Sequence, residues 1–142
     1  DMLPMQDGRM SPYTVLLPPG YFQPENASKT YPVVYFGHGL GMQPMDLTSI
    51  AIIAQQAMVD SSVEESKRMP KFIFVIADGH CIPGGDVTQA ALDPSGDLCE
   101  EGAFYTNHPE GKYQGEDMFI QLESVIDSKY RTKPPADLPV TE

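Results

Sequence analysis

The chain has 142 residues, which suits one modest domain and is too short for two domains of ordinary size. It carries 20 acidic residues against 9 basic ones, and its net charge of −11 repels the phosphates of nucleic acids and the head groups of anionic lipids. We therefore expect no nucleic-acid partner. No segment approaches the ~18 consecutive apolar residues of a membrane span, so we expect no span. The opening residues 1–4 are not a basic and apolar leader, so we expect any signal peptide to be absent from the chain.

Two segments near the amino terminus predict neighbouring strands. Residues 13–17 (YTVLL) form a compact apolar run, and it stops at Pro18 and Pro19 because proline cannot continue a ladder of hydrogen bonds. Residues 7–9 (DGR) have the composition of a tight turn. We therefore expect an earlier strand that ends near Met5 and forms a hairpin with the run at 13–17.

Residues 32–41 (PVVYFGHGLG) combine a buried strand with a glycine-rich turn. The apolar residues through Phe36 suit a strand that is covered by helices on both faces. Gly37, Gly39 and Gly41 allow the backbone to turn sharply and to come close to a bound molecule. In α/β proteins such turns lie at the carboxyl end of the sheet, where ligands bind. The sequence thus predicts a ligand-binding turn that carries His38.

A helix, a strand and a second helix follow this turn. We expect the first helix at 46–60, with Asp46 as its N-terminal cap, and a continuous apolar strand at 71–77 that ends in a turn at 78–80. The second helix is expected at 116–128, with acidic residues in its first turn and basic residues after its last. Residues 138–140 lead toward a further strand. The expected core faces of the two helices are Leu47, Ile50, Ala51, Ala54, Ala57 and Met58, and Met118, Phe119, Leu122, Val125 and Ile126.

This alternation of strands and helices predicts an α/β fold with a mixed sheet between helices. Between the last strand and the last helix, residues 81–112 lack any periodic pattern. A connection of this length is generally functional or poorly ordered.

The two cysteines, Cys81 and Cys99, both lie in this long connection. As a disulfide they would close a loop, which is worth roughly 3 kcal/mol in the chain-entropy model. The alternative is two free thiols in a reducing compartment. We favour the disulfide, which implies a secreted or periplasmic protein.

The same region offers no convincing metal site. One imaginable zinc set has ligands whose spacing fits no known zinc pattern, and a second, acidic set lacks the glycine and ligand spacing of a calcium loop. We expect no metal and no other cofactor. The two rejected sets are Asp78, His80, Cys81, Asp86 and His108, and Asp93, Asp97, Glu100 and Glu101.

With these segments in place, the chain resembles the esterase D group of the α/β-hydrolases. The group includes S-formylglutathione hydrolases, feruloyl and acetyl-xylan esterases and mycolyltransferases. The resemblance covers nearly the whole chain and is carried by YTVLLPPGY (13–21), YPVVYFGHGLG (31–41), FIFVIADG (72–79) and residues 102–132, which include FYTN and VIDSKYRT. It implies that residues 1–142 form the amino-terminal part of a three-layer α/β-hydrolase sandwich whose sheet is incomplete in this chain.

The resemblance also implies ester hydrolysis by a Ser-His-Asp/Glu triad whose serine lies in a G-x-S-x-G elbow. The sequence contains no G-x-S-x-G. We therefore expect a partial domain that is truncated before the elbow, and we assign no catalytic role to Ser61, Ser95 or Ser128.

One half of the oxyanion hole is the part of the site that the resemblance places within the chain. In this fold one donor is the N–H after the serine, and the other comes from the loop after the third strand. We expect the backbone N–H of Leu40 to be that second donor, with Gly39 and Gly41 shaping the turn. His38 is expected to shape the loop and to contact the substrate, and not to act as a general base. Tyr105 is expected to contact the substrate, and anchoring of its own loop is the alternative.

These expectations describe a fragment or subunit of a serine carboxylic-ester hydrolase. The substrate would be a small-molecule or carbohydrate-linked ester, the latter by resemblance only. The carboxy-terminal half of the same domain, or a second chain, would complete the site. The alternative is a non-catalytic, degenerate hydrolase domain that is used for binding or assembly.

Overall fold

The computed structural model describes residues 1–4, 10–39, 42, 44–79, 105, 107 and 115–134. Within these residues the chain forms strands β1 (Met2–Pro4), β2 (Met10–Leu16), β3 (Val33–Gly37) and β4 (Ile73–Ala77), and helices α1 (Pro44–Ala57) and α3 (Gly115–Lys129). Two short 3-10 helices, η1 (Pro24–Asn26) and η2 (Glu65–Lys67), lie in the connections.

The four strands form one mixed sheet in the order β1-β2-β4-β3. β1 pairs with β2 and β2 pairs with β4 in the antiparallel sense, whereas β3 and β4 are parallel. The parallel register places Gly37 beside Ala77, so both strands end at the same level of the sheet. The turns that follow β3 and β4 are therefore neighbours in space.

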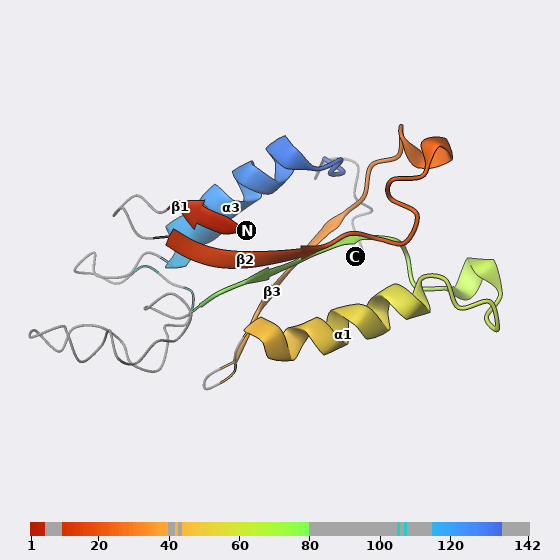
Figure 1. The fold of residues 1–142 in the computed structure, drawn as a ribbon, viewed down its shortest axis with the longest axis horizontal. Coiled ribbons are helices and arrows are strands. Elements are labelled where there is room, and N and C mark those ends of the chain that lie inside the picture. The colour runs from red at the N-terminus through yellow and green to blue at the C-terminus, as the bar shows by residue number, and fades with distance from the viewer. Residues whose placement is uncertain are drawn as a thin grey trace, which may run out of the picture.

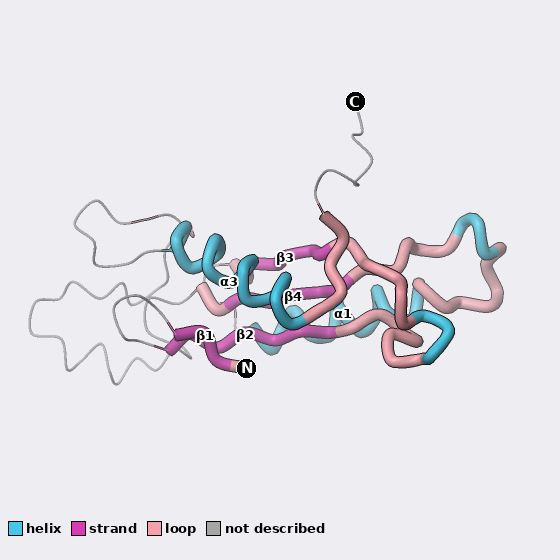
Figure 2. Tube along the Cα trace, turned by 90° about the horizontal axis from the view of Figure 1, so that it is seen from above, coloured by secondary structure: helices cyan, strands magenta, loops and turns pink. Residues whose placement is uncertain are grey.

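Two helices cover opposite faces of this sheet (Figure 1). In the view turned by 90°, α3 passes in front of the strands and α1 behind them (Figure 2). β4 is buried along its whole length, and its side chains alternate between the two helices. The core on the α3 side consists of Leu3, Tyr13, Tyr21, Tyr31, Ile73, Val75, Ala77, Met118, Leu122 and Ile126, and the core on the α1 side of Leu47, Ala51, Phe74 and Ile76.

The structure confirms the predicted strands and helices within a few residues at each end. The predicted mixed sheet between two helices is also confirmed. The apolar face predicted for α3 is correct: three of its members are buried, while Phe119 and Val125 are partly buried against the same core. The predicted tight turn at 7–9, the long connection, both cysteines and the segment at 138–140 lie outside the described residues, apart from Tyr105 and Asn107.

Two details of the prediction for α1 are wrong. The helix begins at Pro44, so Asp46 lies within its first turn and is not the cap. Proline suits a first helical position because its fixed φ is already helical and its missing N–H has no partner to lose there. Ile50 is 46% exposed, because the buried stripe of Leu47, Ala51 and Ala54 is narrow and Ile50 lies on its flank.

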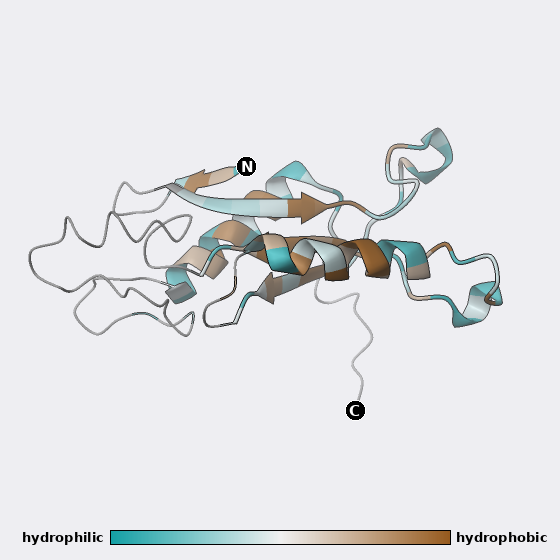
Figure 3. Ribbon diagram, turned by 60° about the horizontal axis from the view of Figure 1, so that its bottom comes forward, coloured by the Kyte–Doolittle hydropathy of each residue, from teal (hydrophilic) through white to brown (hydrophobic). Residues whose placement is uncertain are grey.

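The outward side of α1 remains apolar. Figure 3 shows this helix facing the viewer, and hydrophobic colour covers much of its length. Ile53 is 64% exposed, and Ile52 and Val59 are also exposed. Large apolar side chains that are exposed close together generally mark a contact with another part of a protein.

The outer edge of β3 has no neighbouring strand among the described residues. The segment after α3 begins to pair with the chain just before this strand: Tyr31 and Thr132 form a parallel bridge. The N–H of Tyr31 donates to the carbonyl of Arg131 at 2.9 Å, and the N–H of Lys133 donates to the carbonyl of Tyr31 at 2.8 Å. Because the Pro32 carbonyl instead accepts the N–H of Ile73, the segment at 131–133 lies on the side of β3 that faces away from β4.

Candidate active site

The two parallel strands place a histidine and an aspartate side by side. His38 directly follows β3 and Asp78 directly follows β4, and both side chains are buried. The Nε2 atom of His38 lies 3.3 Å from Oδ1 of Asp78. An Asp that is 1% exposed carries a large desolvation cost in its charged form, so such a group is kept where polar partners surround it.

Both ring nitrogens of His38 also contact the backbone. Nε2 accepts the N–H of Gly79 at 2.9 Å, and Nδ1 lies 3.1 Å from the carbonyl oxygen of Gly39. With a proton on Nδ1 alone the ring satisfies both backbone contacts, because Nε2 can then accept. The contact of Nε2 with Asp78 in that case needs a proton on the carboxyl group. A proton on Nε2 would favour the Asp78 carboxylate and would remove the acceptor of the Gly79 N–H. The imidazole therefore ties the turn after β3 to the turn after β4.

Tyr105, which belongs to the long connection between β4 and α3, contacts His38. Its hydroxyl donates to the carbonyl of His38 at 3.1 Å, and its ring packs edge-on against the rings of His38 and Phe119. Burial raises the pKa of Tyr105 to about 12, and the negative charge of Asp78 acts in the same direction. The phenol therefore remains a hydrogen-bond donor throughout the neutral range.

Asn107 links the same segment to the start of α3. Its Oδ1 atom accepts the N–H of Glu116 at 3.1 Å and that of Asp117 at 3.2 Å. Its Nδ2 atom donates to Oδ1 of Asp117 at 3.1 Å. Asn107 thus caps the helix from outside it, because the first N–H groups of a helix lack partners within the helix.

Replacing Asn107 with alanine is expected to lower the free energy of unfolding by about 1 kcal/mol, because α3 loses this cap. Asn107→Asp keeps the oxygen that accepts both N–H groups, so its loss should be smaller than that of the alanine variant even though its second oxygen is repelled by Asp117. Urea unfolding followed by circular dichroism measures both. Equal stability of Asn107→Ala and the unmodified protein would show that the cap contributes nothing.

The structure describes some of the residues predicted for the site and not others. His38 and Gly39 follow β3 at the carboxyl end of the parallel strands, and Tyr105, which no sequence pattern links to them, lies against His38. The carbonyl of Gly39 also accepts the N–H of Met42 at 3.0 Å, which closes the turn. Leu40 and Gly41 lie outside the described residues, as do Cys81 and Cys99. The substrate contacts of His38 and Tyr105 stay predictions.

The pairing of His38 with Asp78 was not predicted, although the sequence contains a signal for it. Each residue is the first after an apolar strand, and adjacent parallel strands end at one edge of a sheet. What the sequence does not provide is the register, which decides whether the two residues meet. Asn107 as a cap was also missed, because seven residues separate it from the helix start at Gly115 and local capping patterns do not extend so far.

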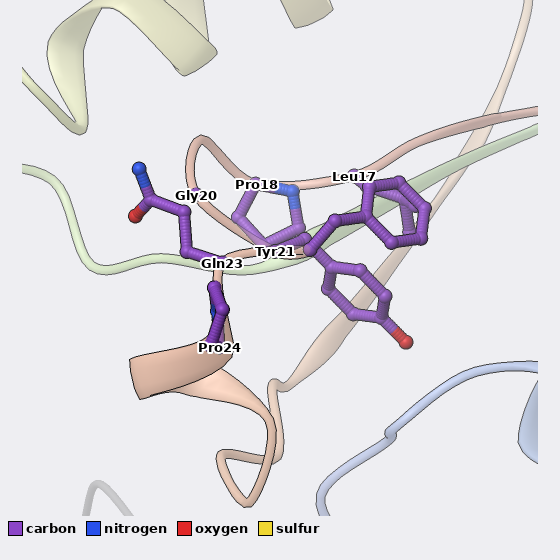
Figure 4. A pocket seen from close by; sticks show the side chains of 7 residues that line it. Leu17, Pro18, Gly20, Tyr21, Gln23 and Pro24 are labelled. Atoms are coloured by element: carbon purple, nitrogen blue, oxygen red, sulfur yellow. The ribbon is translucent and has the colours of Figure 1, made fainter.

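A hollow of about 550 Å³ lies away from this cluster (Figure 4). It follows the carboxyl end of β2, and β2 is antiparallel to β4, so it lies at the opposite end of the sheet from His38. The hollow is shallow and none of its lining side chains is charged at neutral pH, and we assign it no chemistry. Its lining is Leu17, Pro18, Gly20, Tyr21, Phe22, Gln23 and Pro24.

The described residues were also compared with the requirements of a metal site and of a membrane span. Among those residues, no cluster of three or more histidine, cysteine, aspartate or glutamate side chains could hold a metal ion. None of the helices there has the length and apolar character needed to cross a membrane.

No family model and no curated protein matches the chain. Among solved structures, the fold is similar to that of an IroE-like serine hydrolase from Shewanella oneidensis, with a TM-score of 0.52 and 22% sequence identity. The chain has part of an α/β-hydrolase fold. The match covers 93% of this chain and 38% of the hydrolase, so the chain spans well under half of that protein.

This likeness confirms the predicted fold class, a partial α/β-hydrolase sandwich with an incomplete sheet. At 22% identity it shows the fold and leaves the reaction open. Membership of the esterase D group, the ester substrate, the disulfide and the secreted location stay predictions.

Proposed function

We propose that the chain is part of a serine hydrolase that cleaves carboxylic esters, and that the turn after β3 supplies one N–H of its oxyanion hole. The observation that carries this proposal is the buried cluster around His38 at the carboxyl end of β3 and β4. In open α/β sheets, ligands bind at this end. The reaction would proceed through an acyl-enzyme formed by a serine outside residues 1–142, since the sequence holds no G-x-S-x-G elbow.

The contacts of Gly39 support Leu40 as the donor. The carbonyl of Gly39 and the N–H of Leu40 belong to one peptide group, which is planar. That carbonyl is held by the His38 ring at 3.1 Å and by the N–H of Met42 at 3.0 Å. Whatever fixes the carbonyl also restricts the direction of the N–H. Such prior orientation is what an oxyanion hole requires, because its donors must already point to the place where negative charge develops.

We further propose that the carboxy-terminal half of the same domain completes the site. Three observations support this: the apolar outer side of α1, the uncovered edge of β3 and the parallel bridge between Tyr31 and Thr132. The bridge directs the chain after α3 along the side of β3 that lacks a partner among the described strands. The likeness to 38% of a serine hydrolase is in keeping with a remainder that packs on these surfaces.

The full-length polypeptide that contains this sequence should hydrolyse p-nitrophenyl acetate, butyrate or octanoate faster than buffer does. A fluorophosphonate probe, which loses fluoride when a serine oxygen attacks its phosphorus, should label one serine, and mass spectrometry of tryptic peptides locates it. We expect the label outside residues 1–142. Heat-denatured protein is the control for non-specific reaction.

The other outcomes separate the alternatives. Neither turnover nor labelling would support a non-catalytic domain that serves binding or assembly. Turnover without labelling would exclude a serine nucleophile. A labelled serine within residues 1–142 would contradict the view that the nucleophile lies elsewhere.

A further inference from the structure

We infer that Tyr105 is a positioning residue that holds the turn after β3 in the shape that its oxyanion donor needs. The inference rests on the proposed function, because it assigns Tyr105 a part in that same site. It gives Tyr105 a role through the backbone, whereas the sequence predicted a contact with substrate.

The ring of Tyr105 fills the space above two glycines. A Cβ atom built on Gly37 would lie 2.7 Å from Cζ of Tyr105, and one built on Gly79 would lie 2.2 Å from the same atom. Both distances are far shorter than carbon atoms tolerate. The ring therefore rests directly on the backbones of both turns, and only residues without a side chain permit this approach.

The hydroxyl of Tyr105 then fixes the peptide group that joins His38 to Gly39. It donates to the His38 carbonyl at 3.1 Å, and the N–H of Gly39 points the opposite way in the same plane. The following carbonyl, that of Gly39, is held by His38 and Met42. Two successive peptide groups before Leu40 are thus restrained, the first by Tyr105 and the second by the turn itself.

The backbone of Tyr105 is strained, which is further support for a function. Its φ angle is 54°, and Tyr105 is the only non-glycine residue with positive φ in the described part of the chain. This conformation is unfavourable for an L-residue because its Cβ atom comes too close to the following carbonyl oxygen. Strain of this kind persists only where surrounding contacts maintain it, and it occurs often at functional sites. Here the contacts are the His38 carbonyl and the ring of Phe119, whose centroid lies 5.2 Å away.

The test compares Tyr105→Phe with Tyr35→Phe in the full-length polypeptide. Tyr105→Phe keeps the ring and removes one hydrogen bond, so kcat should fall about three- to tenfold with KM unchanged. Affinity for an arylboronic acid, which mimics the tetrahedral intermediate, should fall by the same factor. Tyr35 is the matched control, because its hydroxyl is also buried but has no hydrogen-bond partner in the described part of the chain. Tyr35→Phe should leave kcat unchanged.

A merely structural role for Tyr105 predicts a different result. Thermal stability would fall in Tyr105→Phe, while kcat per fluorophosphonate-reactive serine would stay at the level of the unmodified protein. That outcome would overturn the inference while the proposed function stands.

Inactivity of the unmodified protein would instead refute the proposed function. The positioning role is then judged by nuclear magnetic resonance, without substrate. Tyr105→Phe should shift the amide resonances of Gly39 and Gly79, and Tyr35→Phe should not. Unchanged resonances of both glycines in Tyr105→Phe would contradict the positioning role.

Discussion

Replacing Leu40 with proline is expected to lower kcat of the proposed ester hydrolysis by about 10²–10³-fold, because proline has no backbone N–H and one oxyanion donor is lost. The loss should appear in kcat, with KM nearly unchanged, since the donor acts on charge that develops only in the transition state. Steady-state kinetics of p-nitrophenyl butyrate hydrolysis by the full-length polypeptide measures the effect.

Leu40→Ala is the matched control for this prediction. It removes the side chain but keeps the N–H, so it should retain kcat within about threefold if the backbone is the working group. Thermal unfolding of both variants separates a catalytic loss from a folding defect, because proline also restricts the residue before it. A folded Leu40→Pro protein with undiminished kcat would refute Leu40 as the donor.

Replacing Gly79 with alanine is expected to destabilise the protein by about 2–3 kcal/mol, because overpacking of a filled site forces its neighbours to move. The new Cβ would lie 2.2 Å from Cζ of Tyr105 and 2.3 Å from its hydroxyl oxygen. The ring cannot remain in place, and its displacement also breaks the hydrogen bond to His38. Chemical denaturation of the full-length polypeptide measures the loss.

Two comparisons make this prediction specific. Gly39→Ala should cost less than about 1 kcal/mol, because its Cβ meets only the sulfur of Met42, at 3.4 Å. Gly79→Ala in a Tyr105→Ala background should also cost little, since the ring that it strikes is gone. An equal cost of Gly79→Ala in both backgrounds would show that Tyr105 is not what excludes a side chain at this position.

Most of the fold could be predicted from the sequence, because each element has a strong local signal. The apolar run at 71–77 is continuous, which suits a central strand, and β4 is buried along its length. The 3.6-residue spacing of Met118, Leu122 and Ile126 predicts the buried face of α3. The errors fall at the start and the flank of α1, where a proline decides the first turn and burial depends on how far the sheet extends beneath the helix.

The site was less predictable, because its contacts are non-local. Glycines at 37, 39 and 41 predict a turn, but they do not show what fills the space beside them. That role belongs to Tyr105, which lies far along the chain, and no pattern in the sequence connects the two. The pairing of His38 with Asp78 likewise depends on a parallel register that only the assembled sheet provides.

The strand order has a consequence for how the protein folds. β2 pairs with β4 through Tyr13 beside Ala77, although β3 and α1 lie between the two strands in sequence. β3 is joined to β4 through the crossover that contains α1, whereas β2 must close a longer stretch of chain, which includes β3 and α1, to reach β4. Such long-range pairing is slow compared with helix formation. During synthesis the amino-terminal hairpin therefore remains without its partner strand until β4 has been synthesised, which is also when the turn at His38 can meet its neighbour at Asp78.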